Sequence, residues 1–412
     1  MAKNQQYIMG LDIGTSKVSA AIAERKEDGA LDVVGIGMAP SHGLRRGVVV
    51  NLETTVESVK QAVEEAELMA GVDMERAFVA AAGAHAKGFN CRGVVAISGR
   101  DREVTREDVS RVLEAARAVP IPKDRTVFNV LAQEFIVDEQ GGISDPVGFS
   151  GSRLEANVHI VTGSVSSLQN SINCVNRAGI EVTETVLSAI AAGEAVLTSD
   201  ERELGVALVD IGGGTTDIAV FRHGSVSHTS VLPVGGDHLT NDLAVGLRTP
   251  IPEAEKIKKK YGCALAALVQ EDETIEVPSV GGRKARQLSR KILSEILEAR
   301  TEEIFSMVLE DIQRAGLEKH ITAGVVLCGG GSILEGVPDV AEQVFDLQVR
   351  RGVPSAIGGL VDVVAGANYA TVVGLLKYGE KRQPGQERSP AAGVFLTRMG
   401  GSVRRWFGDF LT

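Results

Sequence analysis

Short apolar runs alternate along this chain with stretches in which apolar residues return every third or fourth position. The runs are typical of buried strands and the stretches of amphipathic helices. Two runs end in an aspartate, Asp12 and Asp210, and each resumes after a short turn as a second apolar run. Other strands are predicted at residues 33–39, 76–82, 157–163, 180–187, 226–234 and 324–328, and helices at 54–71, 165–178, 188–197, 233–245, 252–261, 287–316 and 340–345. This order predicts an α/β protein with two similarly built halves, each a sheet covered by helices on both faces.

Residues 84–156 interrupt this pattern. Short predicted strands at 93–98 and 126–135 surround one charged helix at 106–116, and prolines break up the remainder. Such a segment favours a small α+β insertion over continued sheet-and-helix winding. Residues 379–393 are rich in Lys, Arg, Gln, Pro and Gly and carry few large apolar groups, which predicts a flexible linker.

The last stretch, residues 394–412, has a strongly amphipathic pattern. At 100° per residue its large apolar side chains fall on one half of a helix and its arginines on the other. The chain's one Trp and three of its eleven Phe lie there. We expect a helix in a lipid interface, with these side chains toward the membrane: Phe395, Met399, Val403, Trp406, Phe407, Phe410 and Leu411. A helix that docks on the protein's own body or on a protein partner is the alternative.

Composition narrows the classes of function. The 412 residues carry a formal net charge of −11, which argues against nucleic acid as the main partner. The four cysteines form no CxxC pair and have no histidine nearby, so neither a zinc site nor a disulfide framework is predicted. Asp12 and Lys17 interrupt the apolar residues near the start, so no signal peptide is expected. No apolar run approaches the roughly 20 residues of a membrane span.

The two aspartate-ending runs carry the candidate chemistry. Residues 9–17 read MGLDIGTSK and residues 209–217 read VDIGGGTTD, so each has an apolar strand, an Asp and a Gly/Ser/Thr turn. Glycines let the backbone approach an oxyanion closely, and clustered N–H groups with hydroxyls form an anion-binding concavity. An Asp does not bind phosphate itself, so its expected partner is a phosphate-bound divalent cation. With a third glycine run, CGGGS at residues 328–332, the pattern predicts a nucleotide held between two pseudo-equivalent halves.

This set of three loops resembles the actin and sugar-kinase ATPase superfamily, in which two phosphate loops and an adenosine loop enclose the nucleotide. The sequence has no P-loop, and Asp217 stands where a dinucleotide-binding G-x-G-x-x-G motif needs its third glycine. With the insertion and the tail, the whole chain resembles the FtsA family of bacterial cell-division proteins, most specifically in residues 10–17, 203–215 and 278–283 and in the tail. The resemblance implies an actin-like ATPase fold, with two related halves around a nucleotide cleft, a small α+β insertion in the first half and a C-terminal amphipathic helix.

The resemblance also implies a division of the chain. The first actin-like core subdomain would comprise residues 1–83, 157–200 and about 365–378, with the inserted subdomain at 84–156. The second core subdomain would comprise residues 201–238 and 305–364, with a smaller partner-binding subdomain at 239–304. The linker (379–393) and the membrane-targeting helix (394–412) would follow.

By the same resemblance the ligands are ATP and Mg²⁺. Asp12 and Asp210 would face the metal through its waters. Glu194 stands near the position that orients the attacking water in actin and could serve as a base, the alternative being a surface Glu at a helix end. Lys17 would contact phosphate, the alternative being a solvated charge. The remaining implied contacts are Gly14, Thr15 and Ser16 on one side of the phosphates; Gly212, Gly213, Gly214, Thr215 and Thr216 on the other; Gly235 and Gly236 near the α-phosphate and ribose; Glu255 and Lys258 at the ribose and adenine edge; and Gly329, Gly330, Gly331 and Ser332 behind the adenine. ATP hydrolysis is expected to be slow or negligible.

Partners and location follow from the resemblance too. The FtsZ C-terminal tail would bind at Arg286, Arg300 and Glu303, the inserted subdomain would recruit later divisome proteins, and copies of the chain would polymerise as actin-like filaments. The chain would be a peripheral protein on the cytoplasmic face of the inner membrane, tethering FtsZ filaments to anionic lipid at the division septum and helping to assemble the Z ring. A pilus-assembly protein of FtsA-like fold and a small-molecule kinase of the same superfamily are the alternatives.

Overall fold

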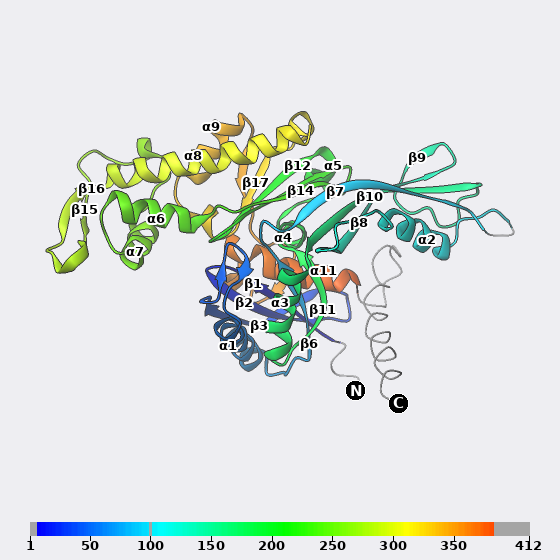
Figure 1. Cartoon of the computed structure of the whole chain (residues 1–412), viewed down its shortest axis with the longest axis horizontal. Helices are drawn as coiled ribbons and strands as arrows, with labels where there is room; N and C mark the ends of the chain where they lie inside the picture. The colour runs from blue at the N-terminus through cyan, green and yellow to red at the C-terminus, as the bar shows by residue number, and fades with distance from the viewer. Residues whose placement is uncertain (1–5, 99–100, 383–412) are drawn as a thin grey trace. The chain divides into compact units, whose positions relative to one another are not determined.

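The computed structural model describes residues 6–98 and 101–382. Within these ranges the chain forms two compact units. The first comprises the described part of Met1–Phe89 together with Ile121–Asn129 and Val161–Gly379, and the second comprises the described parts of Asn90–Pro120, Val130–Ile160 and Glu380–Thr412. Both glycine-rich turns belong to the first unit, which is built on two sheets (Figure 1).

The first sheet surrounds the first glycine-rich turn. Three consecutive antiparallel strands form its centre, and strands parallel to them extend it in the order β11-β6-β1-β2-β3-β19. The strands are β1 (Tyr7–Ile13), β2 (Lys17–Arg25), β3 (Leu31–Pro40), β6 (Arg76–Ala81), β11 (Glu181–Leu187) and β19 (Gly358–Gly359). The predicted succession of three strands, a helix and a strand is therefore confirmed.

Helix α1 (Leu52–Ala70) covers one face of this sheet. It begins at Asn51, whose side chain accepts a hydrogen bond from the Thr54 N–H at 3.3 Å, and it ends at Gly71, whose φ of 68° is a left-handed C-cap. The buried side chains of the helix, including Val59 and Val63, share one core with the strands. Helix α3 (Val165–Arg177) packs beside α1.

The second sheet repeats this plan around the second glycine-rich turn, in the order β14-β13-β12-β17-β18. Its strands are β12 (Val206–Ile211), β13 (Thr216–Arg222), β14 (Ser225–Leu232), β17 (Val325–Cys328) and β18 (Val349–Arg351). Helices α8 (Arg290–Arg314) and α9 (Val337–Phe345) share a core with it, in which the rings of Phe305 and Phe345 meet edge to face at 5.6 Å.

Helix α4 (Ser188–Val196) contacts strands of both sheets. All of its residues are small or aliphatic except Glu194, and a Cβ placed on Gly374 of helix α11 (Ala370–Arg382) would lie 1.8 Å from the Ala191 carbonyl oxygen. The two helices therefore touch at their backbones.

A helical group forms one end of the first unit (Figure 1). It consists of α6 (Gly236–Gly246), α7 (Ile251–Tyr261), the first turns of α8 and a hairpin of β15 (Thr274–Val277) and β16 (Arg286–Ser289), joined by one apolar cluster. The prediction that the long helix begins at Gln287 is wrong. Residues 286–289 pair with β15 as a strand, and the helix starts at Arg290 after the Ser289 cap.

The second unit contains most of a four-stranded sheet and one helix. The sheet has the order β7-β10-β8-β9, with β7 (Lys87–Ala96), β8 (Arg125–Val137), β9 (Gln140–Ile143) and β10 (Arg153–Ser164). Helix α2 (Arg106–Arg117) begins with a capping box in which Thr105 and Asp108 bond each other's backbone N–H groups. The buried face of α2 includes Val109 and Val112. The predicted α+β insertion is confirmed.

Short elements complete the described chain: β4 (Leu44–Arg45), β5 (Val48–Val49), α5 (Ser199–Leu204), α10 (Val361–Val364) and the 3₁₀ turns η1 (Ala266–Leu268), η2 (Val280–Gly282), η3 (Glu318–His320), η4 (Gly330–Ile333) and η5 (Ala367–Tyr369). Helix α11 continues to Arg382, so the prediction that the linker begins at residue 379 is wrong for its first four positions. The rest of the predicted linker and the predicted amphipathic helix lie outside the described residues. Among the described residues, no helix has the length and apolar character needed to span a bilayer.

Candidate functional site

The two glycine-rich turns are closed in the same way. The Gly14 N–H donates to the Lys17 carbonyl at 3.0 Å, and the Gly212 N–H donates to the Thr215 carbonyl at 2.9 Å. The register of the flanking strands is also the same, because each Asp faces the residue seven positions later across its hairpin, Ser19 for Asp12 and Asp217 for Asp210. The repeat seen in the sequence is thus a structural repeat.

The two turns lie against each other. A Cβ on Gly213 would stand 2.9 Å from the Ser16 Cβ, and one on Gly214 would stand 2.7 Å from the Thr15 hydroxyl oxygen. These distances are too short for any larger residue at the two glycine positions without a shift of the neighbours. Glycine therefore allows the turns of the two halves to approach closely.

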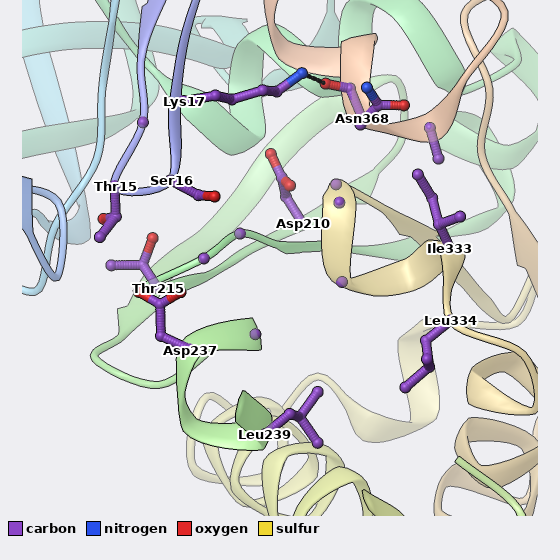
Figure 2. Close-up of a pocket in the computed structure, with 18 of the residues that line it drawn as sticks. Thr15, Ser16, Lys17, Asp210, Thr215, Asp237, Leu239, Ile333, Leu334 and Asn368 are labelled. Atoms are coloured by element: carbon purple, nitrogen blue, oxygen red, sulfur yellow. Dashed lines mark hydrogen bonds between the residues drawn. The ribbon is translucent and has the colours of Figure 1, made fainter. Parts of the chain in front are cut away.

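A cavity of about 660 Å³ opens beside the paired turns (Figure 2). Figure 2 shows Thr15, Ser16 and Lys17 on one side, with Asp210 and Thr215 from the second half facing them. Most of the predicted nucleotide residues line this cavity: Asp12, Gly14, Thr15, Ser16, Lys17, Asp210, Gly212, Gly213, Thr215, Gly236, Glu255, Lys258, Gly329, Gly330 and Gly331.

Four predicted glycine-loop residues are not part of the lining that the structure describes. The hydroxyl of Thr216 donates to the Val234 carbonyl at 2.8 Å, and that of Ser332 donates to the Gly329 carbonyl at 2.8 Å. Gly235 lies behind the second turn, where a Cβ would stand 2.6–2.9 Å from three of its carbonyl oxygens, and Gly214 contacts Thr15. These residues shape the loops from behind.

Glu194 does not line the cavity in the described structure either. Its carboxylate pairs with Arg202 at 3.0 Å, and a second guanidinium nitrogen of Arg202 donates to the Gly193 carbonyl at 2.6 Å. Both side chains are mostly buried. Glu194 and Arg202 therefore tie helix α4 to α5. The Glu194 side chain is not the surface group of the alternative, because it is mostly buried, and its water-orienting role stays a prediction.

Three carboxyl groups gather at the phosphate end of the cavity. Burial raises the pKa of Asp12 to about 7, with the Asp210 carboxylate adding to the shift and Lys17 opposing it. Burial also raises the pKa of Asp210, whereas a hydrogen bond from Thr371 and the charge of Lys17 lower it by less. Asp217, which the sequence analysis did not assign to the site, has a pKa raised well above its usual range by burial and then by the other two carboxylates.

The Asp217 oxygens have different surroundings. Oδ2 accepts a hydrogen bond from the Thr215 hydroxyl at 3.0 Å, whereas the buried Oδ1 has no partner within the part of the chain that the structure describes. A buried polar atom of this kind needs a ligand, an ion or a water. Among the described residues no three Asp, Glu, His or Cys side chains form a ready-made metal cage. The arrangement suits a cation that brings its own waters and phosphate oxygens.

Lys17 extends into the same region (Figure 2). Its ammonium donates to the Asn368 carbonyl at 3.0 Å and lies 4.6 Å from the centre of the Tyr369 ring. Burial lowers the pKa of Lys17, and the carboxylates of Asp12 and Asp210 oppose that shift. The alternative of a freely solvated charge is therefore wrong.

The other end of the cavity combines one polar cluster with apolar side chains. The Lys258 ammonium lies 2.7 Å from the Glu255 carboxylate and 2.9 Å from the Gly236 carbonyl. Leu239, Ile333 and Leu334 face the cavity nearby (Figure 2), and such a surface suits a flat, apolar ring. The sequence analysis missed these three residues, as well as Asp237, Asn368 and Thr371 in the lining.

The predicted partner-binding residues lie on β16 (Arg286) and on α8 (Arg300 and Glu303), and none of them is in the cavity lining that the structure describes. Arg300 pairs through two nitrogens with Asp242 of α6, at 2.5 and 3.1 Å, and also with Glu303. Arg286 donates to the Leu247 carbonyl and to the Ser279 hydroxyl. Ion pairs and backbone contacts thus hold both arginines against the helical group.

Comparison with known proteins adds the family. The sequence model described as "Cell division protein FtsA" matches residues 207–374, and the model described as "SHS2 domain inserted in FTSA" matches residues 83–162. The protein named cell division protein FtsA of Pseudomonas aeruginosa is 53% identical over 378 residues, which cover 92% of this chain and 90% of that relative. The FtsA protein of Escherichia coli strain K12 is 40% identical over 419 residues, covering 98% and 99%.

The chain belongs to the FtsA family of cell division proteins. The resemblance described from the sequence is thereby confirmed, as is the general role in cell division.

Solved structures agree on the fold. The chain is similar to a chain of a PilM–PilN type IV pilus biogenesis complex (TM-score 0.62, 15% identity, 90% of this chain and 98% of that one). It is also similar to MreB5 of Spiroplasma citri bound to ADP (TM-score 0.54, 16% identity, 92% and 97%) and to a MamK double helical filament (TM-score 0.52, 13% identity, 91% and 98%). At these identities the likeness shows the fold alone, and it confirms the actin-like fold expected for an FtsA protein.

Proposed function

We propose that this FtsA protein binds ATP with Mg²⁺ in the cavity beside its paired turns. The observation that carries the proposal is the pair of equivalent hairpins, each with an Asp near the end of its first strand and a glycine-rich turn closed by one backbone hydrogen bond. Two opposed anion cradles with two carboxylates suit a polyphosphate and a cation together. The MreB5 protein described as bound to ADP has the same fold, which agrees with this proposal.

The residues present fit these ligands. The turns at Gly14–Lys17 and Gly212–Thr215 would hold the phosphates, and Asp12 and Asp210 would face the cation through its waters. The unpartnered Asp217 Oδ1 supplies one more acceptor for such a water. Bound Mg²⁺ would neutralise phosphate charge. Gly236, Glu255 and Lys258 would lie at the ribose and adenine edge, and Gly329–Gly331 behind the adenine, with Thr216, Gly214, Gly235 and Ser332 shaping the loops.

We expect slow or negligible ATP hydrolysis. A general base must lie within hydrogen-bond reach of the water that it activates. Glu194, the one candidate that the sequence suggested, is held by Arg202. The nucleotide thus acts mainly as a conformational ligand.

The second part of the proposal is that the helical group binds the C-terminal tail of FtsZ. Asp242 and the 78% exposed Val245 are three residues apart on α6, so they share one face of the helix, and Arg300 pairs with Asp242 on that face. An exposed apolar side chain beside an arginine fits an acidic, partly apolar peptide. Arg286, Arg300 and Glu303 are the contacts that we propose.

The third part concerns the membrane and assembly. We propose that residues 394–412 form the amphipathic helix that attaches the protein to anionic lipid on the cytoplasmic face of the inner membrane, at the division septum. Copies would polymerise as actin-like filaments, tether FtsZ filaments in the Z ring and recruit later divisome proteins through the inserted subdomain. A single interfacial helix is a modest anchor, and assembly of several copies would multiply its effect. The domain boundaries given with the sequence are part of this proposal.

The alternatives are not favoured. A pilus-assembly protein shares the fold at 15% identity, whereas the FtsA relatives match nearly the whole chain at 40–53%. A small-molecule kinase of the same superfamily leaves the tail unexplained.

Cosedimentation with anionic vesicles tests the proposal as a whole. The full chain should pellet with vesicles and bring an FtsZ tail peptide with it, whereas a chain that lacks residues 394–412 should stay in solution and still bind the peptide and ATP. Vesicle binding that survives the deletion would refute the membrane role of the tail. A peptide that binds neither form would refute the FtsZ site.

A further inference from the structure

One short segment contacts all three glycine-rich loops of the site. The segment is Ala367–Thr371, which consists of the 3₁₀ turn η5 and the first two residues of α11. Its Ala367 carbonyl accepts the Gly329 N–H of the third loop at 3.0 Å, and its Asn368 carbonyl accepts the Lys17 ammonium of the first at 3.0 Å. Its Thr371 hydroxyl donates to the Asp210 carboxylate of the second at 2.9 Å. The contacts with Asp210 and Lys17 span 161 and 351 residues of sequence.

The contact of Thr371 with Asp210 is the most specific of the three. The Thr371 side chain is 7% exposed, and its hydroxyl meets the Oδ2 atom of Asp210 in the interior. On the other side, a Cβ on Gly329 would stand 2.2 Å from the Oδ1 atom of Asp210. The carboxylate is thus held between the hydroxyl of Thr371 and the backbone of Gly329. A hydrogen bond from a hydroxyl to a carboxylate is stronger than one between neutral groups, so the Thr371 hydroxyl holds the Asp210 carboxylate in a fixed orientation.

The same segment sets the position of Lys17. The Asn368 carbonyl accepts a hydrogen bond from its ammonium group (Figure 2), and the Tyr369 ring lies 4.6 Å from the same group. The segment itself is well anchored, because α11 packs directly on the first sheet. A Cβ on Gly10 of strand β1 would stand 2.8 Å from the Val372 carbonyl oxygen, just beyond the segment. A rigid helix end therefore positions one cation and one anion of the site.

We propose that the first turn of α11 is a fourth element of the nucleotide site, in which Thr371 is a positioning residue that orients Asp210 toward the nucleotide-bound cation. The proposal rests on the proposed binding of ATP with Mg²⁺. A residue that acts through the cation-facing carboxylate affects ATP binding only when the cation is present. The binding of Mg²⁺–ATP and the binding of metal-free ATP should therefore respond differently to its substitution. Removal of the Thr371 hydroxyl should weaken the binding of Mg²⁺–ATP and leave the binding of metal-free ATP nearly unchanged.

The test measures the dissociation constant of ATP for the full chain by calorimetry, once with Mg²⁺ and once with EDTA. Thr371→Val keeps the shape of the side chain and removes its hydroxyl, so the constant with Mg²⁺ should rise about tenfold, the order expected when a hydrogen bond to a charged group is lost. The constant in EDTA should change less than about twofold. Thr371→Ser, which restores the hydroxyl, should resemble the wild type. The matched control is Thr301→Val, which removes a buried hydroxyl that bonds only within α8, to the Leu297 carbonyl at 2.7 Å.

Two results would overturn the positioning role. One is a Thr371→Val variant in which both constants stay at their wild-type values. The other is an equal loss of affinity with and without Mg²⁺, which a merely structural residue would produce. If Thr371→Val does not fold, Thr371→Ala is measured in its place with the same expected ratio. In an Asp210→Asn background the Thr371 substitution should have no further effect on the ratio. A wild-type chain that binds no ATP in either buffer would refute the proposed function. If the wild type binds ATP more tightly with Mg²⁺ than with EDTA, and Thr371→Val shows the same difference, only this inference is refuted.

Discussion

Gly329 and Gly330 are adjacent in the third loop, yet the structure predicts a large loss of stability when Gly329 is replaced by alanine and none when Gly330 is. Gly329 has φ 82° and ψ 168°, a backbone conformation that is nearly restricted to glycine. A Cβ there would stand 2.2 Å from the Asp210 Oδ1 atom and 2.6 Å from the Ile211 carbonyl oxygen. Among the described residues, no atom lies within 4 Å of a Cβ built on Gly330, which belongs to the 3₁₀ turn η4.

The expected cost at Gly329 has two parts. The backbone conformation costs a non-glycine residue about 1 to 3 kcal/mol. The overlap with a backbone carbonyl and a buried carboxylate adds about 1 to 3 kcal/mol, the usual cost of overpacking. Gly329→Ala should therefore destabilise the fold by about 2 to 6 kcal/mol. Gly330→Ala should be neutral, because the new methyl group meets open space.

Thermal unfolding of the two variants checks this difference. If the second half melts as a unit of roughly 150–250 residues, the midpoint of Gly329→Ala should fall by on the order of 10 °C, and that of Gly330→Ala should stay within about 2 °C of the wild type. Equal midpoints for the two variants would refute the reasoning, because the two substitutions are chemically identical and differ only in their surroundings.

Three further predictions concern other parts of the chain. Arg300→Glu places a carboxylate against Asp242, so an FtsZ tail peptide should bind more weakly in fluorescence anisotropy while ATP binding survives; loss of both would indicate misfolding and leave the site claim without support. Trp406→Glu should release the protein from anionic vesicles, because burial of one large aromatic side chain contributes about 1.5 to 3 kcal/mol; an undiminished bound fraction would contradict the membrane role. Burial alone would raise the pKa of Asp108, but hydrogen bonds from Thr105, Arg111 and Ser98 hold this pKa below its usual range. The ionised Asp108 therefore stabilises the fold fully above the unfolded pKa of about 3.9. This stabilisation is lost as the pH falls through the lower pKa of the folded state. Asp108→Asn should therefore lower the free energy of unfolding of the inserted subdomain at pH 7 by about 1 kcal/mol, the usual contribution of a cap. The difference in unfolding free energy between variant and wild type should become smaller in acid, and a difference that is constant with pH would refute the linkage.

Local patterns predicted the hairpins well, because an apolar run, an Asp and a glycine turn are all read from neighbouring residues. Strand register also carries information that the sequence analysis did not use. A four-residue turn after Ile211 places Asp217 directly across from Asp210, so Asp217 was available as a site residue from counting alone. The start of α8 was mistaken because residues 286–289 are compatible with a helix until their partner strand is known.

Other parts of the site depend on contacts between distant segments, which no periodicity reveals. Thr371 lies in an apolar stretch and gives no local sign that it will meet Asp210. The pairing of Glu194 with Arg202 joins two short helices, and neither residue type indicates whether it faces the cavity. Leu239 and Ile333 read as ordinary core positions until the loops that carry them are brought to one cavity wall.

Calorimetric titration of the full chain with ATP in the presence of Mg²⁺ tests the central claim most directly. We expect one ATP to bind per wild-type chain, with a lower affinity when EDTA replaces Mg²⁺. The Asp210→Ala variant should bind ATP more weakly than the wild type even when Mg²⁺ is present. An Asp210→Ala variant that binds Mg²⁺–ATP as tightly as the wild type would contradict it.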